Sequence, residues 1–225
     1  MTKDTLAQVA YSALRADLLS CRLVPGEPIR ISSTVSRLGV NLSAVREALS
    51  RLVAEGLVTA IHHRGFRAAP ISLEDLQDLT SVRIEIESSC LKRSLRVGDL
   101  AWESGLVAAY HRLSKTEVPS TADSENSDAF ALAHDGFHDA LVAACDSEWL
   151  LRLRGILYHQ SERYRRLAEK IGRHDRNLDA EHEELFNACI ARDEAKASEL
   201  INNHLRRTAS VLLDSKDSFN WEGFA

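Results

Sequence analysis

The sequence has little of what would place a protein outside the cell or in a membrane. Its four cysteines, Cys21, Cys90, Cys145 and Cys189, are widely spaced, and no two form a Cys-x-x-Cys pair. Scattered cysteines of this kind favour reduced, mostly buried thiols over a disulfide framework. No apolar run approaches the roughly 18 residues of a membrane span, and no secretory signal is recognisable. We therefore expect a cytoplasmic protein with no membrane partner.

A large excess of either charge is also lacking, since the 225-residue chain has a net charge of −5. The charge is nevertheless unevenly distributed. Residues 1–70 contain nine Lys and Arg against five Asp and Glu, whereas residues 71–225 contain nineteen against twenty-eight. A basic first part and an acidic second part indicate that only the first part binds a polyanion.

The first part of the chain begins with three predicted helices. The spacing of apolar residues predicts helices over residues 6–20, 32–38 and 43–55. Ser32 or Ser33 is expected to cap the second helix and Ser43 the third, because hydroxyl side chains accept the unpaired N–H groups of a first turn. Gly39 and Gly56 are expected to follow the ends of these two helices. A turn-rich segment, Val24-Pro25-Gly26-Glu27-Pro28, separates the first two helices.

Two predicted strands follow the third helix. Residues 57–61 and 65–69 are short, largely apolar runs joined by the hairpin His62-His63-Arg64-Gly65. Two short helices followed by a β-hairpin are typical of a winged helix-turn-helix domain. We therefore predict such a domain over residues 1–70, with double-stranded DNA as its partner.

The start of the third helix is expected to enter the major groove of DNA, as recognition helices do. Arg46 lies one turn into this helix and can bind a guanine edge or a phosphate. The alternative is a surface ion pair of Arg46 with Glu47 or Glu55, and the consistent order of the whole segment favours DNA. The predicted DNA contacts are Ser32, Asn41, Leu42, Ser43, Arg46, His62, Arg64 and Gly65.

The rest of the chain is predicted to be helical. Helical spacing extends over residues 73–96, 99–115, 127–145, 148–171, 175–191 and 194–213. A polar break over residues 117–127 predicts a solvated loop. The predicted fold is thus mainly α: an N-terminal winged helix-turn-helix and a C-terminal antiparallel all-helical bundle over residues 71–225.

Four histidines of the second part have spacings that could bring them together. His134 and His138 are four residues apart on one predicted helix and share a face, and His182 and His204 lie on two further helices. Histidines that converge in a bundle core can bind a divalent transition metal, most readily zinc, with nickel as another candidate. From spacing alone, a structural role for each histidine remains the commoner case.

The order of several motifs in the first part resembles the GntR superfamily of DNA-binding regulators. These motifs are Pro25-Gly26, Leu38-Gly39-Val40, Val45-Arg46-Glu47-Ala48-Leu49, Glu55-Gly56-Leu57-Val58 and Arg64-Gly65-Phe66. The resemblance implies that Arg46 contacts the operator. The sequence departs from the family at Asn41-Leu42-Ser43-Ala44, where Leu42 cannot hydrogen-bond a base but can contact a thymine methyl. This departure leaves DNA binding in place and indicates an unusual operator.

Residues 72–213 resemble the FCD effector domain of the FadR-like branch of that superfamily. The motifs are Val82-Arg83 with Glu87, Phe137-His138-Asp139-Ala140-Leu141, His182 and His204. In metal-binding members an Asp, a His four residues later and two further histidines are the ligands. The resemblance therefore implies metal ligation by His138, His182 and His204, with His134 at the Asp position. Asp135 could replace His134 or orient a ligand.

The same resemblance implies a small organic acid effector whose carboxylate binds the metal. Arg83 is the first candidate for a second carboxylate contact, and its alternative role is an ion pair with Glu87. Arg163 and Tyr164 are further candidates that could equally be surface or interface residues. Similarity to the carbon-starvation-induced regulator group implies a dicarboxylate such as glutarate, and it rests on three stretches: Ala133-His134-Asp135-Gly136-Phe137-His138, Ser147-Glu148-Trp149-Leu150-Leu151 and Arg163-Tyr164-Arg165.

The leading interpretation is a non-enzymatic, ligand-responsive repressor. Each protomer of a homodimer would bind one half of a near-palindromic operator. One alternative keeps the fold but gives it a metal-free effector site. Another is a metal-dependent hydrolase, and it lacks an identifiable general base such as the Glu of His-Glu-x-x-His.

Overall fold

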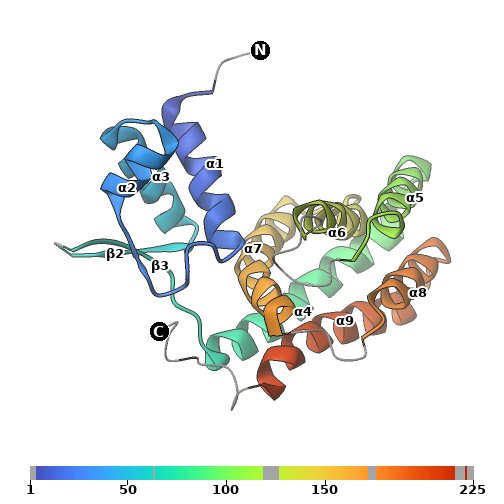
Figure 1. Ribbon diagram of the computed structural model, residues 1–225. Helices are drawn as coiled ribbons and strands as arrows, with labels where there is room; N and C mark the ends of the chain where they lie inside the picture. The colour runs from blue at the N-terminus through green and yellow to red at the C-terminus, as the bar shows by residue number, and fades with distance from the viewer. Residues whose placement is uncertain (1–3, 63, 119–126, 172–175, 216–220, 222–225) are drawn as a thin grey trace.

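The computed structural model describes residues 4–62, 64–118, 127–171, 176–215 and 221 of the chain. Helices dominate, and the small sheet belongs to the N-terminal part (Figure 1). The prediction of a mainly α fold is therefore confirmed. The two parts lie side by side, and α7 is the helix of the bundle that contacts α1.

The N-terminal part is a winged helix-turn-helix. Its elements are α1 (Leu6–Leu19), β1 (Pro28–Ile29), α2 (Ile31–Leu38), α3 (Leu42–Ala54), β2 (Val58–Ile61) and β3 (Gly65–Ala68). The strands form an antiparallel sheet in the order β1-β3-β2. Leu14 and Leu18 of α1 and Leu49 and Leu52 of α3 are fully buried and share one hydrophobic core. Burial of these side chains fixes the recognition helix α3 against the rest of the domain.

Two cap predictions in this part are wrong, and one short strand was not predicted. The caps of α2 and α3 are Arg30 and Asn41, because each helix begins one residue before the expected serine. The side chain of Asn41 accepts a hydrogen bond from the N–H of Ala44 at 2.8 Å, so Ser43 lies inside the helix. Strand β1 was not expected, because two residues are too short to show a period of alternation. Its pairing with β3, Ile29 opposite Phe66, is what defines it.

The C-terminal part is an antiparallel helical bundle. Its helices are α4 (Leu73–Val97), α5 (Leu100–Ser114), α6 (Ser127–Val142), α7 (Glu148–Ile171), α8 (Leu178–Ile190) and α9 (Glu194–Asp214). Its main core includes Phe137 and Leu141 of α6, Leu185 of α8 and Ile201 of α9, all nearly inaccessible to solvent. Helix α6 ends three residues earlier than predicted. Most of the predicted polar loop, residues 119–126, and the predicted first residue of α8, residue 175, lie outside the described residues.

Two further expectations concern the cysteines and membrane association. All four cysteines are buried thiols outside any disulfide, as predicted. Burial raises the pKa of the Cys189 thiol to about 12, which keeps it protonated and unreactive at neutral pH. Within the described residues, no helix is both long and apolar enough to cross a membrane.

Helix α7 joins the two parts through hydrogen bonds to the backbone of the DNA-binding part. The side chain of Gln160 donates to the carbonyl of Glu55 at the end of α3, at 2.8 Å. Arg163, which is buried, donates to the carbonyl of Ala69 at 2.7 Å. Gly56 follows α3 with a φ of 71°, and a Cβ there would lie 3.1 Å from the Nε2 of Gln160. The positive φ therefore favours glycine at this position, and a larger residue would also displace the Gln160 side chain by a few tenths of an ångström.

Candidate DNA-binding surface and histidine site

All eight residues predicted to contact DNA are exposed. They are Ser32, Asn41, Leu42, Ser43, Arg46, His62, Arg64 and Gly65. Leu42, with 52% of its surface exposed, lies at the first position of α3. Gly65 has a φ of 96° and begins β3 after the hairpin. These residues are therefore accessible to a partner, and their contact with DNA stays a prediction.

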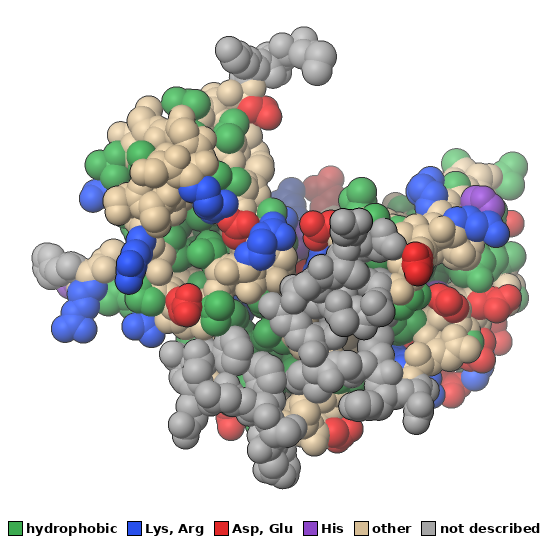
Figure 2. Space-filling model, viewed as in Figure 1, with side chains coloured by type: hydrophobic (Ala, Val, Ile, Leu, Met, Phe, Trp, Pro, Cys, Tyr) green, Lys and Arg blue, Asp and Glu red, His purple; other side chains and the backbone are tan. Residues whose placement is uncertain are grey.

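The alternative role of Arg46 in a surface ion pair is not observed. Glu55 accepts hydrogen bonds from Tyr11 at 2.6 Å and from Arg15 at 3.2 Å, both on α1. Among the described residues, no ion pair of Arg46 is found. Figure 2 shows Lys and Arg side chains over the winged part and Asp and Glu side chains gathered at the right, over α8. The exposed guanidinium of Arg46 thus belongs to the basic part of a molecule with segregated charge.

The four predicted histidines converge in the core of the helical bundle. His134 and His138 come from α6, His182 from α8 and His204 from α9. Each offers one ring nitrogen such that all four nitrogens lie within 4.8 Å of one another. All four residues are buried. Four imidazole nitrogens gathered at this range form a donor set suited to a tetrahedral transition-metal ion.

Burial in the cluster favours the neutral form of His134, His138 and His204. Burial, followed by repulsion from the other histidines, holds the pKa of His138 well below its usual range, and burial does the same for His134. Burial also lowers the pKa of His204. Both ring nitrogens of His138 are buried without a hydrogen-bond partner among the described residues. An unsatisfied buried imidazole is costly, and a metal ion would remove this cost, so the residues fit a metal.

A second layer of charges orients the histidines. Nδ1 of His204 lies 3.0 Å from the Glu181 carboxylate, and donation of its proton there directs the lone pair of Nε2 towards the cluster. Arg176 donates to both oxygens of Glu181, at 2.9 and 2.7 Å. On the other side, Arg154 donates to the carbonyl of His138 at 2.9 Å and to Glu87 at 2.8 Å. These contacts hold the ring of His204 and the backbone of His138 in place.

Asp135, the alternative to His134 as a ligand, lies outside the histidine group found among the described residues. Its carboxylate accepts a hydrogen bond from the hydroxyl of Tyr158. Burial and the charge of Glu162 raise the pKa of Asp135 to about 6. The nearest of its oxygens is 3.9 Å from Nδ1 of His134. This geometry favours a supporting role over direct ligation.

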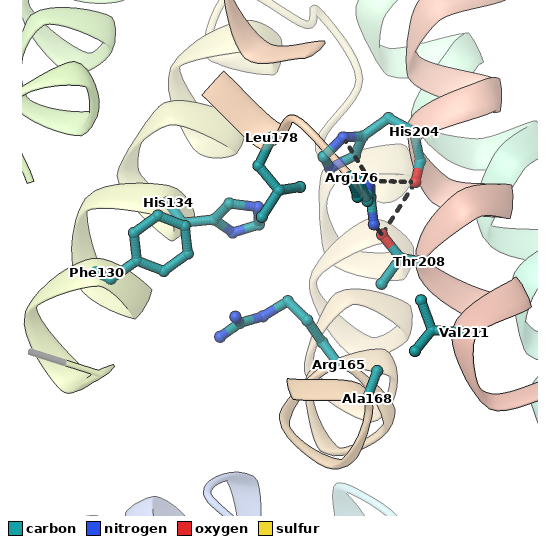
Figure 3. Close-up of a pocket in the computed structure, with 9 residues that line it drawn as sticks. All are labelled: Phe130, His134, Arg165, Ala168, Arg176, Leu178, His204, Thr208 and Val211. Carbon is teal, nitrogen blue, oxygen red and sulfur yellow. Dashed lines mark hydrogen bonds between the residues drawn. The ribbon is translucent and has the colours of Figure 1, made fainter. Parts of the chain in front are cut away.

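A pocket opens beside the histidines (Figure 3). Its lining combines two histidines, two arginines and an apolar wall. The lining residues are Phe130, His134, Arg165, Ala168, Arg176, Leu178, His204, Thr208 and Val211. Its free volume is about 30 Å³, which is room for one or two water molecules. The arrangement suits an anion with an apolar body, and a ligand larger than water requires a side chain to move.

The three predicted effector contacts lie elsewhere. Arg83 is paired with Glu87 at 3.4 Å and donates to Ser161, which is the alternative role predicted for it. Arg163 lies at the junction with Ala69, and the hydroxyl of Tyr164 donates to Asp75 at 2.5 Å. Arg83 and Tyr164 line a smaller neighbouring cavity. Their contact with an effector stays a prediction.

Sequence reasoning missed Arg165 and Arg176 as pocket residues. Successive residues of a helix are about 100° apart around its axis. Arg165 therefore points away from Arg163, two residues earlier, which faces the domain junction. The sequence shows arginines at 163, 165 and 166. Which of them faces the histidines depends on how α7 is rotated about its axis, and the sequence does not show this rotation. Arg176 lies before the start of α8, so helical periodicity cannot predict where its side chain points.

A winged helix-turn-helix joined to a helical bundle with a buried polar site defines a two-part transcription regulator. The family model described as bacterial regulatory proteins, gntR family, matches residues 6–67, and the FCD domain model matches residues 78–207. The chain therefore belongs to the GntR family of bacterial regulatory proteins and carries an FCD domain.

Relatives support this assignment. The chain is 39% identical over 209 residues to the uncharacterized HTH-type transcriptional regulator BphR of Paraburkholderia xenovorans, covering 92% of this chain and 85% of that protein. It is 36% identical over 204 residues to the HTH-type transcriptional repressor GlaR of Escherichia coli, covering 87% and 90%. These relatives and both families are transcription regulators and not enzymes, as predicted for this chain.

Solved structures show the same fold. A putative transcriptional regulator GntR from Rhodococcus superposes with a TM-score of 0.74 at 20% identity, covering 93% of this chain and 98% of that one. McbR/YncC of Escherichia coli superposes with a TM-score of 0.76 at 17% identity, covering 95% and 100%. The winged domain and the helical domain therefore occur together in known regulators of this architecture.

Proposed function

We propose that this regulator is a repressor whose operator binding responds to a small organic acid held beside a zinc ion. The four-histidine cluster carries the proposal, because four buried imidazole nitrogens lie within 4.8 Å of one another. A structural role for histidines would leave the buried nitrogens of His138 without hydrogen bonds. His134, His138, His182 and His204 would hold the ion, with nickel or another divalent transition metal as the competing occupant.

The effector is an acid because its binding site is positively charged. A bound zinc ion would supply a Lewis-acidic centre for one carboxylate oxygen of the effector. The pocket residues Arg165 and Arg176 add positive charge beside the cluster, and Phe130, Leu178 and Val211 supply an apolar wall. The chain itself binds, orients and shields the ligand, and the buried wall keeps water away from it.

The DNA partner is a near-palindromic operator bound by a homodimer. A single winged helix-turn-helix contacts one half-site, with Asn41, Leu42, Ser43 and Arg46 of the recognition helix in the major groove and the hairpin at the backbone or minor groove. Trp149, Leu153 and Ile156 form an exposed apolar stripe on α7, which supports association of two copies. The dimer would place two recognition helices on successive half-sites.

Elemental analysis of protein purified without chelators tests the zinc site. We expect about one zinc ion per chain in the wild type, as a tetrahedral site requires, and little in His138→Ala. His111→Ala is the matched control, because His111 is exposed on α5, and it should retain the metal. A wild-type protein without transition metal would contradict the proposal, as would equal metal content in His138→Ala.

A further inference from the structure

The pocket beside the histidines is too small for an organic acid as it stands, with about 30 Å³ free. Two charged side chains, Arg165 and Arg176, fill its open side together with apolar groups. A ligand with a carboxylate at each end and an aliphatic middle matches this lining. One carboxylate would lie at the histidine cluster and the other at an arginine, since a guanidinium fork binds a carboxylate bidentately.

The two arginines differ in what their movement would cost. Arg176 donates to both oxygens of Glu181, which in turn orients His204, so its release would disturb a metal ligand. Arg165 instead pairs with Glu162, one turn earlier on the same helix, with 2.7 Å between Nε and Oε2. An internal carboxylate thus occupies the fork of Arg165, and its replacement by an effector carboxylate breaks none of the hydrogen bonds that orient His204.

Glu162 reaches towards the DNA-binding part as well. It lines a cavity of about 400 Å³ between the two parts, together with Arg15 of α1 and Arg22, which follows that helix. Arg166 donates to Glu162 at 3.1 Å on the same side. Arg15 at present pairs with Glu55, the last residue of the recognition helix region before Gly56. A Glu162 released from Arg165 would stay paired with Arg166 and would face, across the same cavity, the arginine that holds the end of α3.

Building on the proposed function, we propose that a dicarboxylate effector binds Arg165 in place of Glu162. The released Glu162 then competes with Glu55 for Arg15. In this way, effector binding in the pocket weakens the ion pair between Arg15 of α1 and Glu55 at the end of the recognition helix. Glu162 thus acts as an internal competitor of the effector, and Arg15 is the first residue of the DNA-binding part to respond.

Isothermal titration of the full-length protein as purified, with its zinc content measured, tests the exchange. The probes are succinate, glutarate and adipate, and pentanoate is the monocarboxylate control. We expect Arg165→Met to weaken binding of the best dicarboxylate about tenfold or more, to near the level of pentanoate, and Glu162→Gln to strengthen it about fivefold. Arg112→Met, an exposed control on α5, should bind as the wild type does.

The sign of the Glu162→Gln effect separates this exchange from a merely structural ion pair, whose loss would weaken binding. Equal binding by Arg165→Met and wild type, weaker binding by Glu162→Gln, or no binding of any of the three dicarboxylates would overturn the proposal. The expected variant pattern in a protein that lacks zinc would overturn the proposed metal site and support the exchange. Bound zinc together with dicarboxylate binding that Arg165→Met does not weaken would support the metal site and overturn the exchange.

The link to DNA has its own variant. The probe is double-stranded DNA recovered from a random pool by the wild-type protein. Arg15→Met should bind the dicarboxylate like the wild type, but its affinity for this DNA should no longer change when the dicarboxylate is added. Glu162→Gln should bind the dicarboxylate more tightly than the wild type, but its DNA affinity should also no longer respond, because a neutral amide cannot compete with Glu55 for Arg15. An unaltered response of Arg15→Met would overturn the role of Arg15 in the link.

Discussion

The two candidate sites of this regulator are built in opposite ways. The DNA-binding surface consists of exposed side chains on a helix whose other face is core, with Arg46 outside and Val45 and Leu49 inside. The histidine site consists of buried polar groups with little room between them. An exposed site can change its residues with small effects on stability, whereas a buried polar site contributes to stability and function together.

The largest expected difference between the two sites is in metal-dependent stability. Removal of zinc with a chelator should lower the stability of the wild type by about 4 kcal/mol when zinc exceeds its dissociation constant about a thousandfold, which corresponds to about 10 °C in Tm. Scanning calorimetry before and after re-addition of zinc measures this. His138→Ala should show no such dependence. A wild-type Tm that changes with neither chelator nor added zinc would show that the histidine site does not contribute to stability through a bound metal.

The charge network behind the histidines should come next in magnitude. Glu87→Ala removes a buried carboxylate that pairs with Arg154 at 2.8 Å and Arg83 at 3.4 Å. Breaking a buried pair in this way should cost about 3 kcal/mol. Urea unfolding measures the change, and Glu85→Ala on the exposed face of α4 is the control. Similar midpoints for the two variants would show that the network contributes nothing to the bundle.

At the exposed site, Arg46→Ala should affect DNA binding without affecting the fold. Loss of a base or phosphate contact should weaken operator binding by about 1–3 kcal/mol, while the free energy of unfolding should change by less than about 0.5 kcal/mol. Gel shifts and urea unfolding on the same preparations separate the two effects. Undiminished DNA binding by Arg46→Ala would remove this residue from the recognition surface.

The smallest expected effect tests the helix cap on the DNA-binding surface. Asn41→Ala removes the side chain that accepts the Ala44 N–H and should destabilise the protein by about 1 kcal/mol. Ser43→Ala, inside the helix, should change stability by less than about 0.5 kcal/mol. Thermal unfolding of the two variants measures the difference. A larger effect of Ser43→Ala would restore the cap expected from the sequence.

Much of the fold could be predicted because it depends on local periodicity. Helices α4 to α9 follow the spacing of apolar residues, and Gly39, with a φ of 63°, ends α2 as expected. The metal-binding residues could be proposed because His134 and His138 share a face and the resemblance to FCD domains added His182 and His204. Their convergence within 4.8 Å is a property of helix packing, which the sequence of any one helix does not contain.

The residues that line the pocket were harder to predict because they depend on rotation about helix axes. Arg163 and Arg165 are two residues apart, yet one meets Ala69 at the domain junction and the other lines the pocket. The short strand β1 exists only through its pairing with β3. In each case the deciding contact joins residues distant in sequence, so the composition of either segment alone cannot reveal it.

The hydrogen bond from Gln160 to the carbonyl of Glu55 bears on how freely these two parts could be recombined. The last carbonyls of a helix need partners from outside it, and here one partner for the recognition helix comes from the other domain. A chimera that joins residues 1–70 to a foreign sensor would lose this partner unless the new sensor supplies a donor at the same place. The two parts match separate family models and yet meet at this one backbone atom, so an engineered biosensor would have to preserve that contact.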